Sequence, residues 1–159
     1  MVYIKSSEPP AGIARRVGAA LMQFGRSMEM TKNFAARQLG LHPSDLSCLG
    51  YIYSLGVPVS PKQIIAHLEM SSGTGTALLD RLEKAGYISR LPNPDDRRSV
   101  LIVLDEEKAA RPLSFYKVLR ANYAAAMSTR SEAELEAFAS LLEAFSSLDL
   151  EQQLKQLAP

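Results

Sequence analysis

The sequence contains little cysteine and little histidine, and this narrows the chemistry available to it. Cys48 is the only cysteine among 159 residues, so neither an intramolecular disulfide nor a zinc site made of cysteines can form. The two histidines, His42 and His67, would need several carboxylates beside them to hold a metal, and no spacing of acidic residues suggests such a site. We therefore expect no metal and no cofactor.

Long apolar runs and a strong charge of one sign are also missing. No apolar run approaches the roughly 18–20 residues of a membrane span, and Arg15 and Arg16 interrupt the segment where a signal peptide would be apolar. These features predict a cytoplasmic protein with no membrane partner. The net charge of +1 is low for a protein that binds nucleic acid, so any such function must be argued from local patterns.

The overall composition is that of a globular protein. Apolar residues make up 47% and charged residues 22%, and this length suits one folded unit with a core. We divide the chain into an N-terminal arm and dimerisation helix (1–40), a central domain (41–104) and C-terminal dimerisation helices (105–159). The sequence lacks a phosphate-binding glycine loop, a nucleophile paired with a base, and metal-ligand spacing. We therefore do not expect an enzyme.

Helix-start signals in the central domain predict a helix-turn-helix. A first helix should begin at His42-Pro43-Ser44-Asp45. Ser60, followed by a proline and then by Gln63, forms a capping box for a second helix. Ser71 can cap a third helix, which should end at Gly86. The last two helices are joined by a turn of about three residues, as in a helix-turn-helix.

A β-hairpin should follow directly. Residues 87–91 and the aliphatic run 100–104 are typical of strands, and the turn cluster Asn93-Pro94-Asp95-Asp96 separates them. A hairpin at this point is the wing of a winged helix. The predicted fold class is therefore mainly α with a small β-hairpin wing, flanked by N- and C-terminal helices.

The flanking segments are predicted to be long helices. Apolar residues at helical spacing cover residues 13–34, and Asp105 can cap a helix that runs to about Met127, with Pro112 causing a kink or a short first segment. Ser131 starts a last helix with an apolar stripe, which consists of Leu135, Phe138, Leu141, Leu142 and Phe145. Burying this stripe against a second copy would give a twofold homodimer.

The segment from Leu41 to Leu104 resembles the MarR family of winged-helix transcription regulators. The resemblance is carried by SPKQIIAHL (60–68), LLDRLEKAGYI (78–88) and NPDDRRS (93–99). It implies a homodimer with interlocked terminal helices that binds double-stranded DNA, and a response to small aromatic or phenolic effectors or to oxidants. We expect a ligand-responsive repressor on a pseudo-palindromic operator; the alternative is a winged-helix module that binds proteins and has no sequence-specific contact with DNA.

The start of the helix after Ser71 is the expected DNA-reading element, since a helix fits the major groove and its first turns face base edges. Small hydroxyl and glycine residues there allow close approach of the main chain. Arg97 and Arg98, in the turn of the wing, suit a minor groove. The resemblance implies that Asp96 holds one of these arginines in place. Arg81 could contact DNA or brace Asp80 or Asp96. The DNA-binding candidates are Lys62, Ser71, Ser72, Gly73, Thr74, Thr76, Arg81, Arg97 and Arg98; Lys84 and Arg90 could add phosphate contacts or simply be solvated.

Two further hypotheses concern effectors. A pocket for a small aromatic or phenolic ligand could be lined by His42, Tyr51, Tyr53 and Arg15, although aromatic residues at helical spacing are more often core residues. Cys48 could sense oxidants, but it lies between leucines on an apolar helix without adjacent positive charge. We therefore expect it to fill the core.

Overall fold

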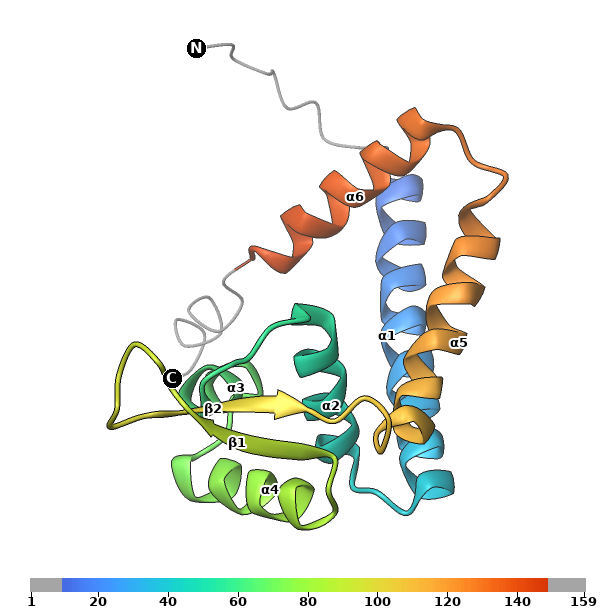
Figure 1. Ribbon diagram of the computed structural model, residues 1–159. Helices are drawn as coiled ribbons and strands as arrows, with labels where there is room; N and C mark the ends of the chain where they lie inside the picture. The colour runs from blue at the N-terminus through green and yellow to red at the C-terminus, as the bar shows by residue number, and fades with distance from the viewer. Residues whose placement is uncertain (1–9, 149–159) are drawn as a thin grey trace, which may run out of the picture. The chain divides into compact units, whose positions relative to one another are not determined.

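The computed structural model describes residues 10–148, which form six helices and one two-stranded sheet (Figure 1). The chain divides into two compact units, residues 1–116 and residues 117–159. In chain order the elements are α1 (Ala11–Leu39), α2 (Pro43–Leu55), α3 (Pro61–His67), α4 (Ser72–Lys84), β1 (Ile88–Pro92), β2 (Val100–Leu104), α5 (Ala110–Met127) and α6 (Glu132–Ser146).

Four of the helices, α2, α3, α4 and α6, begin where the capping residues predict. The Ser60 hydroxyl accepts a hydrogen bond from the Gln63 N–H at 3.3 Å, and the Gln63 side chain accepts one from the Ser60 N–H at 3.1 Å. Ser71 caps α4 in the same way through the Thr74 N–H, and a complete capping box precedes α6. These side chains satisfy main-chain donors that have no partner inside the helix.

The predicted hairpin is present and forms the wing. β1 and β2 are antiparallel, with Ile88 opposite Leu104 and Pro92 opposite Val100. On its other side β2 makes an isolated bridge to Val59, the residue just before the cap of α3. The sheet is therefore joined by main-chain hydrogen bonds to the segment that leads into the helix-turn-helix.

The main hydrophobic cluster of the first unit lies inside the predicted central domain. Residues from α2, α3, α4 and both strands pack into one cluster, whose buried members are Cys48, Leu49, Ile52, Val59, Ile64, Leu78, Leu79, Leu82, Ile88 and Ile102. Burial of these side chains fixes α3 and α4 against the wing. The core thus holds the helix-turn-helix and the hairpin together as one body.

The start of α5 resolves the expectation about Pro112. The Asp105 carboxylate accepts a hydrogen bond from the Lys108 N–H at 3.0 Å, and residues 106–109 form turns before the helix begins at Ala110. Pro112 is therefore the third residue of α5, where an N–H would have no partner within the helix. The helix predicted to start after Asp105 therefore starts five residues later, and a turn precedes it in place of the expected kink or short first helical segment.

Candidate nucleic-acid interface

The first turns of α4 expose small polar side chains, as predicted. Ser72, Gly73, Thr74 and Thr76 are all exposed. The Ser71 and Thr74 hydroxyls lie 2.9 Å apart, and the Thr76 hydroxyl donates to the Ser72 carbonyl at 2.8 Å. A hydroxyl that donates in this way can still accept, so this turn offers acceptors to the amino groups of base edges.

The two glycines of this turn have different roles. A Cβ built on Gly73 meets no atom within 4 Å, whereas one built on Gly75 would lie 2.3 Å from Cγ1 of Ile65 on α3. Gly75 is buried and is needed for the close packing of α3 on α4. The expectation that both glycines give the main chain access to DNA is therefore corrected for Gly75 and remains a prediction for Gly73.

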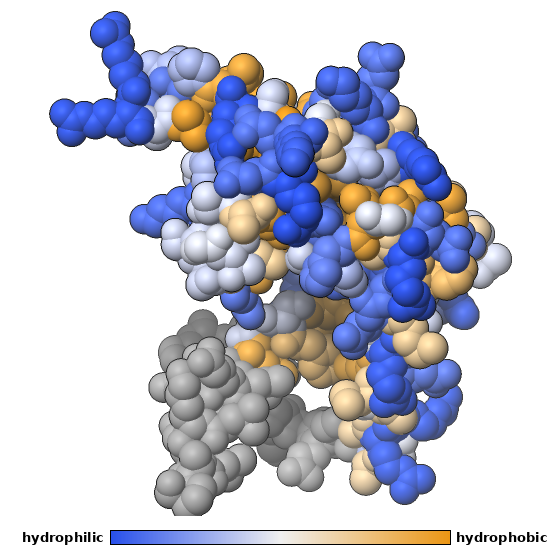
Figure 2. Space-filling model, turned by 90° about the horizontal axis from the view of Figure 1, so that it is seen from below, coloured by the Kyte–Doolittle hydropathy of each residue, from blue (hydrophilic) through white to orange (hydrophobic). Residues whose placement is uncertain are grey.

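The wing presents two exposed arginines. Arg97 and Arg98 are both exposed, and neither forms an ion pair with any residue between 10 and 148. The Asp96 carboxylate accepts a hydrogen bond from the Arg98 N–H at 2.9 Å, so this aspartate fixes the arginine through its main chain. Figure 2 shows long hydrophilic side chains extending outward at the left, where the wing lies.

Arg81 forms an ion pair with Asp45, a residue that the sequence analysis did not connect with it. Its Nη2 lies 2.5 Å from Oδ1 of Asp45, and its Nε lies 3.2 Å from both oxygens of the same carboxylate. The Asp45 side chain is only 3% exposed and that of Arg81 is 51% exposed. The expected brace to Asp80 or Asp96 is wrong: Arg81 joins α4 to the first turn of α2.

A second arginine joins the wing to α4. Nη2 of Arg90, on β1, lies 2.7 Å from Oδ1 of Asp80, and Nη1 bonds to the Glu83 carboxylate. The structure therefore does not support Arg90 as a phosphate contact, because two carboxylates of α4 already bind it. Lys62 and Lys84 are exposed and form no ion pair within the described part of the chain.

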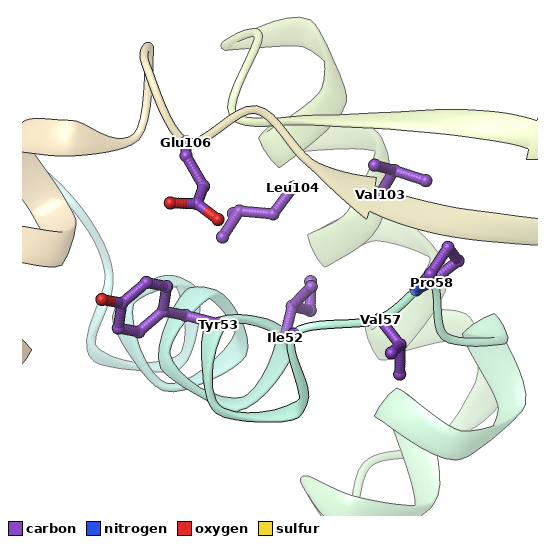
Figure 3. A pocket seen from close by; sticks show the side chains of 8 residues that line it. Ile52, Tyr53, Val57, Pro58, Val103, Leu104 and Glu106 are labelled. Carbon is purple, nitrogen blue, oxygen red and sulfur yellow. The ribbon is translucent and has the colours of Figure 1, made fainter.

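The residues predicted to line an effector pocket are not brought together in the pocket that the structure describes. Of the four, only Tyr53 lines it (Figure 3). The His42 ring contacts Ser44 at the cap of α2, the Tyr51 ring stacks on His67 with centroids 3.7 Å apart, and Arg15 is exposed on α1. Tyr51 and His42 therefore have local structural partners.

Cys48 is a core residue, as expected from its neighbours. Its side chain is fully buried, and burial together with the nearby negative charge of Asp45 raises the pKa of the thiol to about 12. Tyr116 lies in the same region and donates a hydrogen bond from its hydroxyl to the Leu46 carbonyl at 2.8 Å. Since the thiolate is the reactive form of cysteine, this environment disfavours oxidant sensing.

Within residues 10–148, no three histidine, cysteine, aspartate or glutamate side chains gather as metal ligands. No helix in this range is both long and apolar enough to cross a membrane.

Taken together, α3, α4 and the hairpin define the class of the protein: it is a winged helix-turn-helix protein. A sequence model of the MarR family matches residues 41–100. The chain is 45% identical over 69 residues to YcgE, an uncharacterized HTH-type transcriptional regulator of Bacillus subtilis (strain 168), covering 43% of this chain and 44% of YcgE. It is 30% identical over 96 residues to the multiple antibiotic resistance protein MarR of Escherichia coli (strain K12), covering 57% of this chain and 67% of that protein.

The chain belongs to the MarR family. A mutant MepR from a multidrug resistant S. aureus clinical isolate has the same fold, with a TM-score of 0.67 at 22% identity over 84% of this chain and 97% of that one. A second S. aureus MepR mutant, bound to an oligodeoxyribonucleotide, gives 0.55 at 23% identity over 84% and 98%. The chain spans about half the length of the curated relatives that it matches first. These relatives are transcription regulators, in agreement with the prediction that the protein is not an enzyme.

Proposed function

We propose that the protein is a cytoplasmic transcription regulator that binds double-stranded DNA with the start of α4 in the major groove and the wing in the minor groove. The observation that carries this proposal is the combination of an exposed small-residue turn on α4 with two exposed wing arginines that have no carboxylate partner among residues 10–148. The fold shared with a MepR mutant that is bound to an oligodeoxyribonucleotide supports it.

We further propose that the protein acts as a homodimer. In the second unit α6 has no buried residue, and Phe138 and Leu141 on its apolar stripe are 53% and 42% exposed. A continuous apolar helix face of this kind marks a contact surface. A second copy would cover it and would present two winged helices to two half-sites, as a repressor of a pseudo-palindromic operator requires.

Sedimentation at micromolar concentration is expected to give about twice the chain mass of 17.4 kDa. Phe138→Glu should shift the protein toward the monomer, because a charge would then have to be buried in the contact. Glu136→Gln, on a neighbouring exposed position of α6, is the control and should leave the mass unchanged. A wild-type protein that sediments as a monomer would contradict the dimer.

The alternative function is a winged-helix module that binds a protein. The low net charge of +1 and the lack of a basic residue in the first turns of α4 favour it over DNA binding. The two functions differ in their dependence on salt, because phosphate contacts release counterions and protein contacts at the wing would not.

Arg98→Ala tests the wing directly. The variant should bind the duplex upstream of its own gene at least about tenfold more weakly, equivalent to about 1.4 kcal/mol, and the slope of log K against log salt should fall by about one for each lost phosphate contact. The thermal midpoint should hardly change, because the side chain is exposed and forms no described ion pair. Fluorescence titration at two salt concentrations measures both quantities.

Arg15→Ala is the matched control, since it also removes one exposed positive charge but lies on α1, outside the winged helix. Its affinity and salt slope should stay near those of the wild type. Equal losses of affinity in the two variants would mean that the wing contributes only general positive charge and no specific contact. If no duplex from the region upstream of its own gene binds in a salt-dependent way, the result favours the protein-binding alternative.

A further inference from the structure

The exposed face of α4 lacks the long side chains that usually read guanine. Residues 71–80 include no arginine, lysine, asparagine, glutamine or histidine. Guanine presents the acceptors O6 and N7 in the major groove, and its commonest partner is a bidentate arginine or lysine. The next cation along the helix is Arg81, whose guanidinium is held by the buried carboxylate of Asp45. Sequence-specific contacts of this face must therefore come from short side chains.

Thr76 is the short side chain best placed for such a contact. It is exposed, and its neighbours on the same helix face are Gly73, three residues before it, and Asp80, four residues after it. Helical side chains lean toward the N-terminus of their helix, so Thr76 leans over Gly73, where even an added Cβ would meet no atom within 4 Å. Figure 1 shows α4 at the edge of the winged helix, beneath β1. The threonine is therefore open to a base edge.

One hydrogen bond fixes both the polar and the apolar end of this side chain. The Thr76 hydroxyl donates to the Ser72 carbonyl at 2.8 Å, and this bond selects one of the two χ1 rotamers that threonine adopts in helices. Because the hydroxyl proton is used in this bond, the oxygen offers only acceptor lone pairs to a base. The methyl group on the same carbon is held in one position. Thr76 thus presents an acceptor and a methyl group together.

We propose that Thr76 is the specificity-determining residue of α4 and that it reads the 5-methyl group of a pyrimidine close to an exocyclic amino group. This role rests on the proposed function, because it needs α4 in the major groove. A threonine methyl group packs on the methyl group of thymine, and an acceptor oxygen takes a hydrogen bond from an amino group of adenine or cytosine. Two base edges supply both groups: an A·T pair, through adenine and thymine together, and 5-methylcytosine, which carries both on one base.

Removing the methyl groups of thymine tests the first source. The duplex upstream of the gene of this protein is prepared with deoxyuridine in place of thymidine, which changes the major groove and leaves the minor-groove edges as they were. Burial of one methyl group changes a binding constant about fourfold, and a dimer would carry the contact twice. Fluorescence titration of the wild type should therefore give an affinity at least about fourfold lower for the uridine duplex if the contacted base is thymine.

Adding methyl groups to cytosine tests the second source. The same duplex is prepared with 5-methyldeoxycytidine in place of deoxycytidine, and the affinity of the wild type should rise at least about fourfold if the contacted base is cytosine. At least one of the two modified duplexes must show its change, and the duplex that does so identifies the base.

Thr76→Ser removes the methyl group of the side chain and keeps the hydroxyl, so the affinity of this variant should no longer depend on the methyl groups of the duplex. Thr31→Ser is the matched control. Thr31 is exposed on α1, outside the winged helix, and its hydroxyl donates to the Ser27 carbonyl at the same 2.8 Å. This variant should keep the dependence of the wild type on the methyl groups.

Equal affinity of the wild type for all three duplexes overturns this role of Thr76, and the comparison needs no variant. A dependence on methyl groups that persists in Thr76→Ser overturns it as well, because it would then arise from another contact or from the shape of the duplex. Both results leave the proposed function intact. A protein that binds none of the duplexes in a salt-dependent way refutes the proposed function, and the role of Thr76 with it.

Discussion

Replacing Arg81 with methionine is expected to lower the free energy of unfolding by about 3 kcal/mol, because it leaves a buried carboxylate without its counter-charge. The Asp45 side chain is 3% exposed, and the methionine side chain would continue to cover it. Among residues 10–148, the carboxylate would keep only the hydrogen bond that it accepts from the His42 N–H at 3.1 Å. Methionine retains much of the length and apolar stem of arginine, so the loss reports on the charge.

Replacing Asp45, the other partner of this ion pair, should lower the free energy of unfolding by less. Asp45→Asn leaves Arg81 with half of its side chain in water, where the guanidinium stays solvated, and an asparagine can still accept at the cap of α2, so a loss of about 1 kcal/mol is expected. The double variant should lose less than the sum of the two single losses. Urea denaturation measures all three, with Arg97→Met as the control that should change stability by less than about 0.5 kcal/mol. Equal and additive losses would contradict the buried pair.

The starts of α3, α4 and α6 and both ends of β2 could be predicted because their signals are local, whereas α5 begins at Ala110 and not directly after Asp105. Ser60 and Gln63, three residues apart, determine the start of α3, and the same pattern at Ser131 determines the start of α6. The aliphatic run of residues 100–104 is β2 without any change of boundary. Such signals need no knowledge of the tertiary structure, since capping and strand formation act within a few residues.

The contacts of the candidate site could not be predicted in the same way. Asp45 was recognised as a helix-start residue, but its partner Arg81 lies 36 residues later and two elements away. Arg90 similarly looked like a free cation until the fold placed it against Asp80 and Glu83. Charge patterns in a sequence do not say which carboxylate a long side chain will reach once helices pack, so such arginines can be mistaken for DNA contacts.

These two arginines have a shared consequence for the proposed interface. Arg81 joins α4 to α2, and Arg90 joins α4 to β1. Arg90 also offsets one of the two negative charges of Asp80 and Glu83, which would otherwise both repel a phosphate backbone. A residue of β1 therefore partly compensates for the lack of basic residues on α4. The two ion pairs, one to α2 and one to β1, hold α4 in position relative to the wing.

The packing of α3 on α4 gives the second large effect, through two glycines that look equivalent in the sequence. Gly75→Ala is expected to lower the free energy of unfolding by about 2 kcal/mol, because the new methyl group would lie 2.3 Å from Cγ1 and 2.9 Å from Cδ1 of Ile65. This overpacking outweighs the roughly 1 kcal/mol that alanine gains over glycine in a helix. Rotation of the Ile65 side chain would not remove the contact completely, because its Cβ also lies 3.3 Å from the new methyl group.

Gly73→Ala is the matched control and should have the opposite sign. A methyl group there meets no atom within 4 Å, so only the helix propensity remains and stability should rise by up to about 1 kcal/mol. Removing the clashing atoms with Ile65→Ala should make the Gly75→Ala substitution far less costly, so that the double variant is more stable than the sum of the single losses predicts. Thermal and urea denaturation of the four variants measure these differences. If Gly73→Ala and Gly75→Ala changed stability equally, the helix packing would not require Gly75, and main-chain access to DNA would again be a role that both glycines could share.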